Sequence, residues 1–485
     1  MLFAANLGQD NMLTIADAVE ALTNVRPQAT MVITEAVVDS RQVIPGSLFV
    51  AIPGERVDGH EFIPEAFKKG ASFALIQRDV TASLRTIDLR SVSSAEALSG
   101  QDFTTPLCLR VDNTVSALQQ IARYWRRKLD LRVVGITGSV GKSTTKELVA
   151  EVLGTRYRTL KSPGNLNNEI GLPLTILRLS SGYQRAVLEM GFYVPGEIAF
   201  LCDIALPQVG VVTNIGTVHA ERAGSQEAIA SGKAELVQAL PPAPEGVAVL
   251  NFDDPWVRKM EEKTKARVFF YGLSPEANLW ADNVVGLGLE GIRFRLHYQG
   301  EALYVRIPLI GRHSVHTALR AAAVGLAEGM NWQEILEGLN QGHTQLRLAA
   351  VRSQTGALLL DDTYNASPES MLAALNLLSE LGGRKVAVLG DMLELGPYER
   401  GGHEMVGLRA AQVADVLLTL GERAHMLAEA ARRAGMKKTA IIEFTEFEPL
   451  MDWLKTNLTK NDTVLIKGSH SLRMDRITNL LEVRS

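Results

Sequence analysis

A glycine-rich segment with a lysine and a serine at its end is the strongest chemical motif in the sequence. Residues 135–144 read Gly-Ile-Thr-Gly-Ser-Val-Gly-Lys-Ser-Thr, between an apolar run and a helical pattern. Closely spaced glycines let backbone N–H groups approach an anion, and a helix N-terminus adds partial positive charge. Lys142 can neutralise β- and γ-phosphates, and Ser143 can ligate magnesium. The segment therefore predicts a nucleotide-binding P-loop, although Ile136 stands where the general motif has glycine.

The alternative is a glycine-rich turn that only connects a strand to a helix. A P-loop also leaves open whether the phosphate is hydrolysed for motion, used as a switch or transferred to a substrate. The loop residues that we expect to bind ATP are Thr137, Gly138, Ser139, Val140, Gly141, Lys142, Ser143 and Thr144.

Glu189 and His219 follow two later apolar runs that we predict to be strands, at 186–189 and 209–214. Because the carboxyl ends of strands converge on one crevice in open α/β sheets, both side chains could reach a nucleotide-bound magnesium ion. Magnesium prefers oxygen ligands, so Glu189 suits it better than His219. A strand-end charge and a loop histidine remain the simpler interpretations of these two residues.

The elements that must position these residues alternate between apolar runs and helical patterns, which predicts an α/β protein. We expect three domains: a small α/β domain at 1–130, a central P-loop domain with a mostly parallel sheet at 131–345, and a Rossmann-like domain at 346–485. Central strand–helix pairs are predicted at 133–137 with 144–153, 186–189 with 196–202, and 209–214 with 226–240, followed by antiparallel strands at 292–298 and 303–308. Third-domain strands are predicted at 358–361, 386–390, 416–420 and 464–467.

The first domain is predicted from strands at 48–52 and 73–76, a helix at 63–69 and a closing helix from Thr114 to Lys128. Residues 80–106 are rich in Ser, Thr, Asp and Arg with weak periodicity, which predicts a polar loop or insertion.

Length and composition restrict the class of protein. The chain has 485 residues with 46% hydrophobic and 21% charged residues, as expected of a packed multidomain protein. Its net charge of -4 favours neither nucleic acid nor an anionic membrane as a partner. The two cysteines are too few for a disulfide framework and favour the cytoplasm. No run reaches the roughly 18 apolar residues of a membrane span, so we expect no membrane insertion.

Further segments resemble the Mur ligase family over nearly the whole chain. The matching segments are 39–51, 58–62, 135–144, 165–168, Glu189, 213–219, 361–368 and 388–396. The P-loop is common to the family, whereas the asparagine cluster and the last two segments resemble the branch that adds a dipeptide. The resemblance implies an ATP-dependent carbon–nitrogen ligase of peptidoglycan precursor synthesis, and so of cell wall biogenesis and cell division. It would add D-alanyl-D-alanine to UDP-N-acetylmuramoyl-tripeptide through an acyl phosphate, giving the UDP-linked pentapeptide, ADP and phosphate. We expect a monomer.

The resemblance also implies a catalytic set of Lys142, Glu189, His219 and Lys233, with two magnesium ions. Ser143 and Glu189 would serve one ion, and His219 would help to hold the second. Lys233, in the segment 232–236, matches a family lysine that carbon dioxide converts to N6-carboxylysine, a metal ligand. An unmodified lysine cannot ligate magnesium, and without the resemblance Lys233 would be a solvated helix residue.

Substrate contacts are implied in the same way. Ser40 and Arg41 match the segment that binds uridine diphosphate, and Asn165, Asn167 and Asn168 match contacts to the muramoyl peptide. Arg347 and Asp362 match third-domain residues that meet the nucleotide, and Lys467 matches a segment facing the cleft. Taken alone, Arg41 would be a surface charge and the asparagines loop caps.

One segment departs from the family pattern. Residues 311–319 resemble the helix start on the adenine side, but Ser314 and Thr317 stand where asparagines are common. We therefore expect weakened or rerouted recognition of the base. The rival functions are another ligase of this architecture, such as a diamino-acid-adding or folyl-polyglutamate-like enzyme, and a P-loop switch or motor ATPase.

Overall fold

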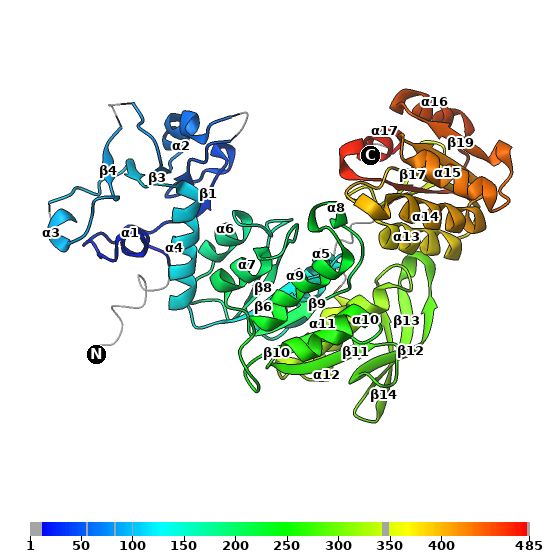
Figure 1. Ribbon diagram of the computed structural model, residues 1–485, viewed down its shortest axis with the longest axis horizontal. Helices are drawn as coiled ribbons and strands as arrows, with labels where there is room; N and C mark the ends of the chain where they lie inside the picture. The colour runs from blue at the N-terminus through cyan, green and yellow to red at the C-terminus, as the bar shows by residue number, and fades with distance from the viewer. Residues whose placement is uncertain (1–11, 55–56, 82–83, 99, 342–348, 483–485) are drawn as a thin grey trace.

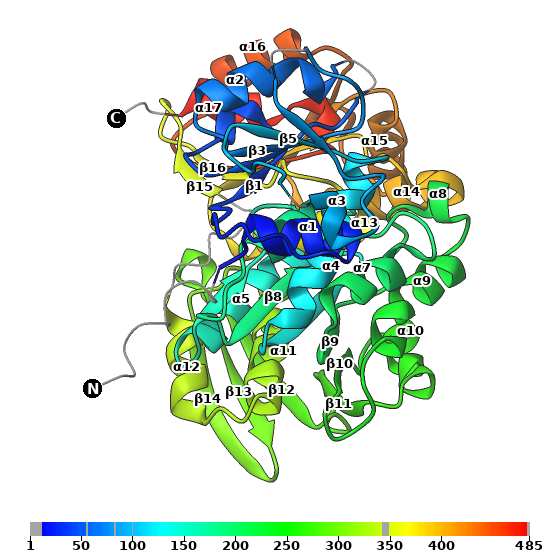
Figure 2. The ribbon, with the colours of Figure 1, turned by 90° about the vertical axis from the view of Figure 1, so that its left-hand side faces the viewer.

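The computed structural model describes residues 12–54, 57–81, 84–98, 100–341 and 349–482, which form three sheets. The first and third sheets lie at opposite ends of the molecule, and the central sheet lies between and below them (Figure 1). A view turned by 90° shows the first and third domains on the same side of the central domain (Figure 2). The predicted three-domain α/β class is confirmed, while the boundaries near residues 130 and 345 stay predictions.

The first domain has a parallel sheet in the order β1-β2-β3-β5-β4. Its elements are α1 (Ile15–Thr23), β1 (Ala36–Val37), β2 (Leu48–Val50), α2 (Ile63–Lys68), β3 (Phe73–Ile76), β4 (Thr86–Asp88), α3 (Ala95–Leu98), β5 (Leu107–Arg110) and α4 (Thr114–Lys128). Residues 80–106 were predicted to be a polar loop or insertion, and the loop alternative was wrong, because this segment contains β4 and α3. β4 is a short edge strand, buried only at its centre, Ile87, so it has no apolar run to reveal it.

The central domain has a sheet in the order β14-β13-β12-β11-β10-β9-β6-β8-β7. Its first strands and helices are β6 (Arg132–Thr137), α5 (Lys142–Gly154), β7 (Thr159–Lys161), α6 (Gly171–Leu177), β8 (Arg185–Glu189), α7 (Glu197–Ala205), β9 (Val209–Val212), α8 (Ala220–Ala223) and α9 (Gln226–Gln238). The remainder are β10 (Val247–Asn251), α10 (Pro255–Arg258), β11 (Arg267–Gly272), β12 (Leu279–Gly286), β13 (Ile292–Tyr298), β14 (Glu301–Ile307), α11 (Ser314–Ala327) and α12 (Trp332–Asn340). Neighbouring strands are parallel except in the pairs β12–β13 and β13–β14, which confirms the predicted antiparallel edge.

The order of these strands determines where a ligand site can form. β6 pairs with β8 on one side and with β9 on the other, so the chain changes direction across the sheet at β6. Ligands of open α/β sheets bind at the carboxyl ends of the strands beside such a switch point. The P-loop that follows β6 therefore lies at the favoured position.

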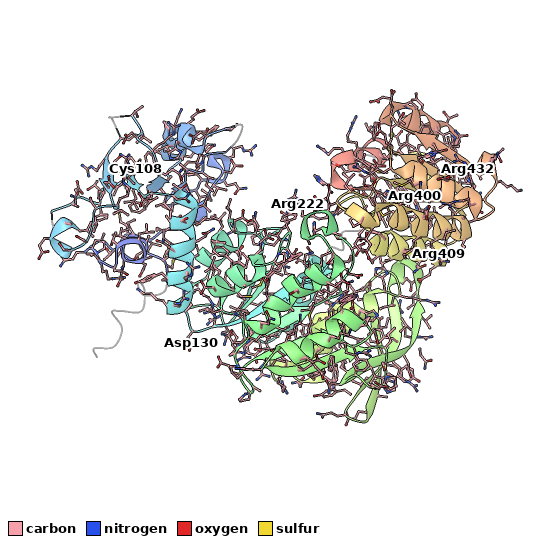
Figure 3. The ribbon with its side chains drawn as sticks, in the orientation of Figure 1. Cys108, Asp130, Arg222, Arg400, Arg409 and Arg432 are labelled. Carbon is pink, nitrogen blue, oxygen red and sulfur yellow. The ribbon has the colours of Figure 1, made fainter. Side chains whose placement is uncertain are left out.

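Apolar packing joins the first domain to the central one through α4, which stands between the first sheet and helices α6 and α7 (Figure 1). Trp125 of α4 is buried and donates from its indole nitrogen to the carbonyl oxygen of Leu179 at 2.9 Å. Asp130 marks the short connection from α4 to β6 at the base of this junction (Figure 3). α4 closes the first domain as predicted and also packs on the second.

The third domain has the strand order β15-β16-β20-β17-β18-β19, in which only β15 is antiparallel to its neighbour. Its elements are β15 (Ala349–Arg352), β16 (Leu358–Asp361), α13 (Pro368–Glu380), β17 (Arg384–Gly390), α14 (Glu399–Val413), β18 (Val416–Leu420), α15 (Ala424–Arg433), β19 (Ile441–Phe444), α16 (Phe447–Asn457), β20 (Asp462–Lys467) and α17 (Asp475–Leu481). Apolar cores lie on both faces of this sheet, as expected for a Rossmann-like arrangement.

Neither cysteine is placed to react. Cys108 and Cys202 are both buried and unpaired, and burial raises the pKa of the Cys108 thiol to about 11. Because the thiolate is the reactive form, burial protects both side chains. Among the described residues, no helix is both long and apolar enough to cross a membrane.

Candidate functional site

The P-loop is held in shape by the segment that follows β9. The Val140 N–H donates to Asn214 Oδ1 at 2.9 Å, the Ser139 N–H donates to the Asn214 carbonyl at 3.0 Å, and the Thr213 hydroxyl donates to the Val140 carbonyl at 2.7 Å. Gly141, with φ of 81°, precedes the first turn of α5. These bonds fix the loop while the N-terminus of α5 is left directed at the cleft, as an anion site requires.

Gly138 is required by the same packing. It has φ of 144°, and a Cβ atom there would lie 1.8 Å from Thr213 Oγ1. We expect Gly138→Ala to lower the free energy of unfolding by about 1–3 kcal/mol, because the loop must move away from Thr213. Chemical denaturation of this variant and of Gly154→Ala checks the prediction, because an added Cβ at Gly154 would meet no atom of another described segment within 4 Å. Equal stability of the two variants would contradict it.

A cleft of about 540 Å³ joins the P-loop to the third domain. Its walls include P-loop residues, the start of α11 and the segment that follows β16. The predicted site residues that line it are Ser139, Val140, Gly141, Lys142, Ser143, Thr144, Asn165, Asn167, Glu189, His219, Asp362 and Lys467. The structure thus brings together most of the residues that the sequence singled out for the nucleotide.

Glu189 is a buried carboxylate at the end of β8, with 1% of its surface exposed. It accepts hydrogen bonds from the Ser143 hydroxyl at 2.6 Å and from the Asn167 side-chain amide at 2.9 Å. The first bond joins the two residues expected to ligate magnesium, and both offer the hard oxygen atoms that this ion prefers. The donor set therefore fits the expected ion.

Two lysine side chains meet at the carbonyl oxygen of Gly138. Lys142 Nζ donates to it at 2.9 Å and Lys233 Nζ at 3.2 Å. Lys233 is 1% exposed, which excludes the solvated helix residue that its sequence alone suggested. Burial, with the Lys142 cation as a second cause, lowers the pKa of Lys233 well below its usual range. A buried amine that tends to be neutral is the form that can react with carbon dioxide.

His219 connects the central and third domains. Its Nδ1 lies 2.7 Å from Glu394 Oε2, and its ring meets Tyr193 edge-on at 4.9 Å between centroids. Burial lowers the pKa of His219 to about 4, although the Glu394 carboxylate acts in the opposite direction. The imidazole is therefore neutral at pH 7, as a metal ligand must be. Glu394 lies in the segment 388–396, for which the sequence had assigned no residue role.

The third domain also contributes an ion pair with a buried lysine to the cleft. Lys467, 2% exposed at the end of β20, donates to Asp362 Oδ2 at 2.6 Å and to the Asn365 carbonyl at 2.9 Å. The pair forms because β16 and β20 are parallel neighbours whose carboxyl ends coincide. Arg347 lies outside the described residues.

Other predicted residues are placed differently. Thr137 is buried and donates to the Met190 carbonyl at 3.1 Å, and it does not line the cleft. Lys233 lies behind the loop at Gly138 and is also absent from the cleft lining. The Asn168 side-chain oxygen accepts from the N–H of Gly171, the first residue of α6, at 2.9 Å.

Asn167 and Asn168 also line a second hollow of about 230 Å³, whose apolar wall includes Phe200 and Leu201. Ser40 and Arg41 lie on the first domain and line neither hollow. The Arg41 side chain is 82% exposed and pairs with Asp39 at 2.6 Å.

The α11 side of the cleft contains a residue that sequence reasoning missed. The Ser314 hydroxyl donates to the Ile310 carbonyl at 2.7 Å, and Thr317 Oγ1 accepts from Arg320 at 2.8 Å. The Ser314 hydroxyl thus contacts the segment before α11, and the Thr317 hydroxyl contacts a residue of its own helix. Arg320 is buried and lines the cleft. A single arginine in the apolar run 318–324 was the signal that could have revealed it.

No group of three or more His, Cys, Asp or Glu side chains suited to a metal ion occurs in the described part of the chain. The residues expected to hold magnesium here also include a hydroxyl and a modified lysine, which are not of these types.

Family models match three parts of the chain: the Mur ligase family, catalytic domain, at 32–126; the Mur ligase middle domain at 136–325; and the Mur ligase, glutamate ligase domain, at 346–470. The chain is 34% identical over 469 residues to the UDP-N-acetylmuramoyl-tripeptide--D-alanyl-D-alanine ligase of Bacillus subtilis, covering 96% of both chains. A crystal structure of MurF from Acinetobacter baumannii is similar with a TM-score of 0.81 and 29% identity, over 98% of this chain and 99% of that one. The crystal structure of MurF ligase from Thermotoga maritima in complex with ADP is similar with a TM-score of 0.75 and 29% identity, over 92% of this chain and 96% of that one.

Proposed function

This chain belongs to the Mur ligase family, and from that premise we propose that it joins D-alanyl-D-alanine to UDP-N-acetylmuramoyl-tripeptide at the expense of ATP. The product is the UDP-linked pentapeptide of peptidoglycan precursor synthesis, released with ADP and phosphate. The observation that carries this proposal is the similarity over 96% of the chain to a relative of that activity, which leaves no domain unmatched. The P-loop supports it, because a relative of the same fold is described in complex with ADP.

The chemistry must bring two anions together, the γ-phosphate of ATP and the terminal carboxylate of the tripeptide. The carboxylate oxygen attacks phosphorus and ADP leaves, which gives an acyl phosphate. The amine of D-alanyl-D-alanine then attacks the carbonyl carbon, and phosphate departs from the tetrahedral intermediate. Positioning and cations must overcome the repulsion in the first step, so the N-terminus of α5 and Lys142 would bind the phosphates.

Ser143 and Glu189 would hold one magnesium ion, and His219 with carboxylated Lys233 would hold a second. Bound magnesium would withdraw negative charge from the phosphates. The burial of Lys233 and the 2.6 Å contact between Ser143 and Glu189 support these assignments. Glu394 would orient the His219 ring from the third domain, since a carboxylate on one ring nitrogen directs the other nitrogen to a metal.

The substrate contacts extend from this cleft toward the first domain. Asn165 and Asn167 would meet the peptide, whereas Asn168 would act through the start of α6, whose first N–H it binds. Ser40 and Arg41 would bind the uridine diphosphate, for which the exposed guanidinium of Arg41 suits a bidentate contact. Asp362 and Lys467 would face the nucleotide from the third domain. We propose a cytoplasmic monomer without nucleic acid or membrane partners.

Phosphate release tests the function. With ATP and magnesium, we expect release that requires both UDP-N-acetylmuramoyl-tripeptide and D-alanyl-D-alanine, because turnover ends only when the amine displaces phosphate. Two control reactions test the rival ligases. A diamino acid with the shorter UDP-linked acceptor should give no phosphate release, and neither should glutamate with a folate. Release indifferent to every acceptor would favour a switch or motor ATPase instead.

A further inference from the structure

Arg320 is a buried arginine in the middle of an apolar helix. It is 5% exposed and belongs to α11, where its neighbours in the run 318–324 are alanine, leucine and valine. Burying a guanidinium is costly unless its donors find acceptors. A buried arginine without such acceptors therefore indicates that a group outside the protein supplies them.

Arg126 shows the satisfied case in the same chain. It is 4% exposed, and its Nε, Nη1 and Nη2 donate to the carbonyls of Ala205, Leu129 and Leu131 at 2.7, 3.0 and 3.0 Å. Arg126 belongs to α4 and binds the carbonyl at the end of α7, so its role is purely structural.

Arg320 is not satisfied in this way. Its Nη2 donates to Thr317 Oγ1 at 2.8 Å, and the guanidinium also contacts the Tyr271 side chain, through a hydrogen bond with its hydroxyl and at 5.8 Å from the guanidinium carbon to the ring centre. Its Nε has no hydrogen-bond partner among the described residues. Among the described residues, no carboxylate forms an ion pair with Arg320.

The titratable groups described around Arg320 do not form ion pairs with it. Burial lowers the pKa of His316 to about 4, with Arg320 as a second cause, and burial also lowers the pKa of His313. The carboxylates of Asp253 and Asp254 are engaged by backbone N–H groups, such as that of Leu273 at 2.7 Å from Asp253 Oδ2. Among the described residues the guanidinium thus has no direct carboxylate partner, so an anionic ligand in the cleft can take that place.

The position of Arg320 identifies the ligand group. A methyl group on the Cα of Gly141 would lie 3.3 Å from Nη2, so the guanidinium lies against the residue that directly precedes α5. Both Arg320 and Lys142 line the 540 Å³ cleft. Backbone N–H groups at the start of α5, Lys142 and Arg320 thus surround one region of the cleft with positive charge, which suits an anion and not a neutral base.

We propose that Arg320 binds the phosphate chain of the nucleotide, as a second side-chain cation beside Lys142. This inference rests on the proposed nucleotide binding and deepens it. Arginine suits this role because its planar fork can contact two phosphate oxygens. Thr317 acts as a positioning residue, because its hydroxyl holds Nη2 in place.

Calorimetric titration of the full-length chain with magnesium and either ADP or GDP tests this proposal. We expect Arg320→Met to weaken ADP binding by about 10- to 100-fold, as the loss of a charge-assisted hydrogen bond would. The affinity for ADP and the affinity for GDP should fall by the same factor, because both nucleotides carry the same diphosphate and differ only in the base. Arg320→Lys keeps the positive charge but not the planar guanidinium, so this variant should lose less nucleotide affinity than Arg320→Met. Arg293→Met removes an exposed arginine from β13 and should bind like wild type.

The outcomes separate this proposal from the proposed function. If wild type bound neither nucleotide, the proposed function itself would fail. If wild type bound ADP and Arg320→Met bound it equally, or lost only ADP affinity and not GDP affinity, Arg320 would not be a phosphate ligand. If Arg320→Met did not fold, Arg320→Lys would decide, and unchanged affinity and salt dependence in that variant would overturn the proposal.

Discussion

Replacing Lys142 by methionine should lower kcat by about 1,000-fold, because the transition state loses a cation aimed at the transferred phosphoryl group. The Lys142 side chain lies at the start of α5, and its amine is within 2.9 Å of the Gly138 carbonyl. A flexible stem allows the same amine to move to a phosphate when a nucleotide binds. Methionine has a similar length and apolar stem, so the loop should keep its shape.

Phosphate release and thermal unfolding, measured on the same preparation, check this prediction. Lys265→Met is a suitable control, because Lys265 is exposed and distant in sequence from the P-loop. The control should leave both quantities unchanged. A Lys142→Met variant that retained most of its kcat would mean that the P-loop lysine is not part of phosphoryl transfer.

Lys233→Met should lower kcat/KM by at least about 100-fold while leaving the free energy of unfolding equal or higher. The activity should fall because the proposed ligand to magnesium would be lost, and even residues behind metal ligands cost about 10- to 100-fold. The fold does not suffer, because exchanging a buried amine for an apolar side chain of similar volume is often neutral or stabilising. A residue with only a structural role would show the reverse pattern.

Two further measurements connect this effect to the carboxylated amine. The intact mass of wild type, prepared with bicarbonate, should exceed the sequence mass by one carbon dioxide, and that excess should be absent from Lys233→Met. Lys233→Ala should regain part of its activity with a short carboxylic acid, which can occupy the space left by the side chain. Full activity of wild-type protein whose mass shows no bound carbon dioxide would contradict the assignment.

The parts of the fold that the sequence revealed are those in which burial repeats regularly. β6, β8 and β9 are continuous apolar runs because helices cover both faces of a parallel sheet. The P-loop was recognisable because its glycines and lysine are local in the chain. Glu189 was placed correctly beside Ser143 because parallel strands end at one edge of the sheet.

What the sequence could not reveal depends on contacts between distant segments. The pairing of His219 with Glu394 spans 175 positions and two domains, so no local pattern encodes it. The burial of Lys233 against Gly138 and the convergence of Lys142 on the same carbonyl likewise follow from packing. Arg320 carried a weak local signal, but its direction toward Gly141 could be seen only once α11 was placed beside α5.

The mass of the nucleotide-linked product tests the central claim most directly. Purified chain, ATP, magnesium, UDP-N-acetylmuramoyl-tripeptide and D-alanyl-D-alanine should give a UDP-linked product heavier than its precursor by one D-alanyl-D-alanine less one water, with one ADP formed for each product molecule. Omitting the dipeptide should leave the precursor mass unchanged. ADP formation with no gain in mass, in the presence of both acceptors, would contradict the ligase activity.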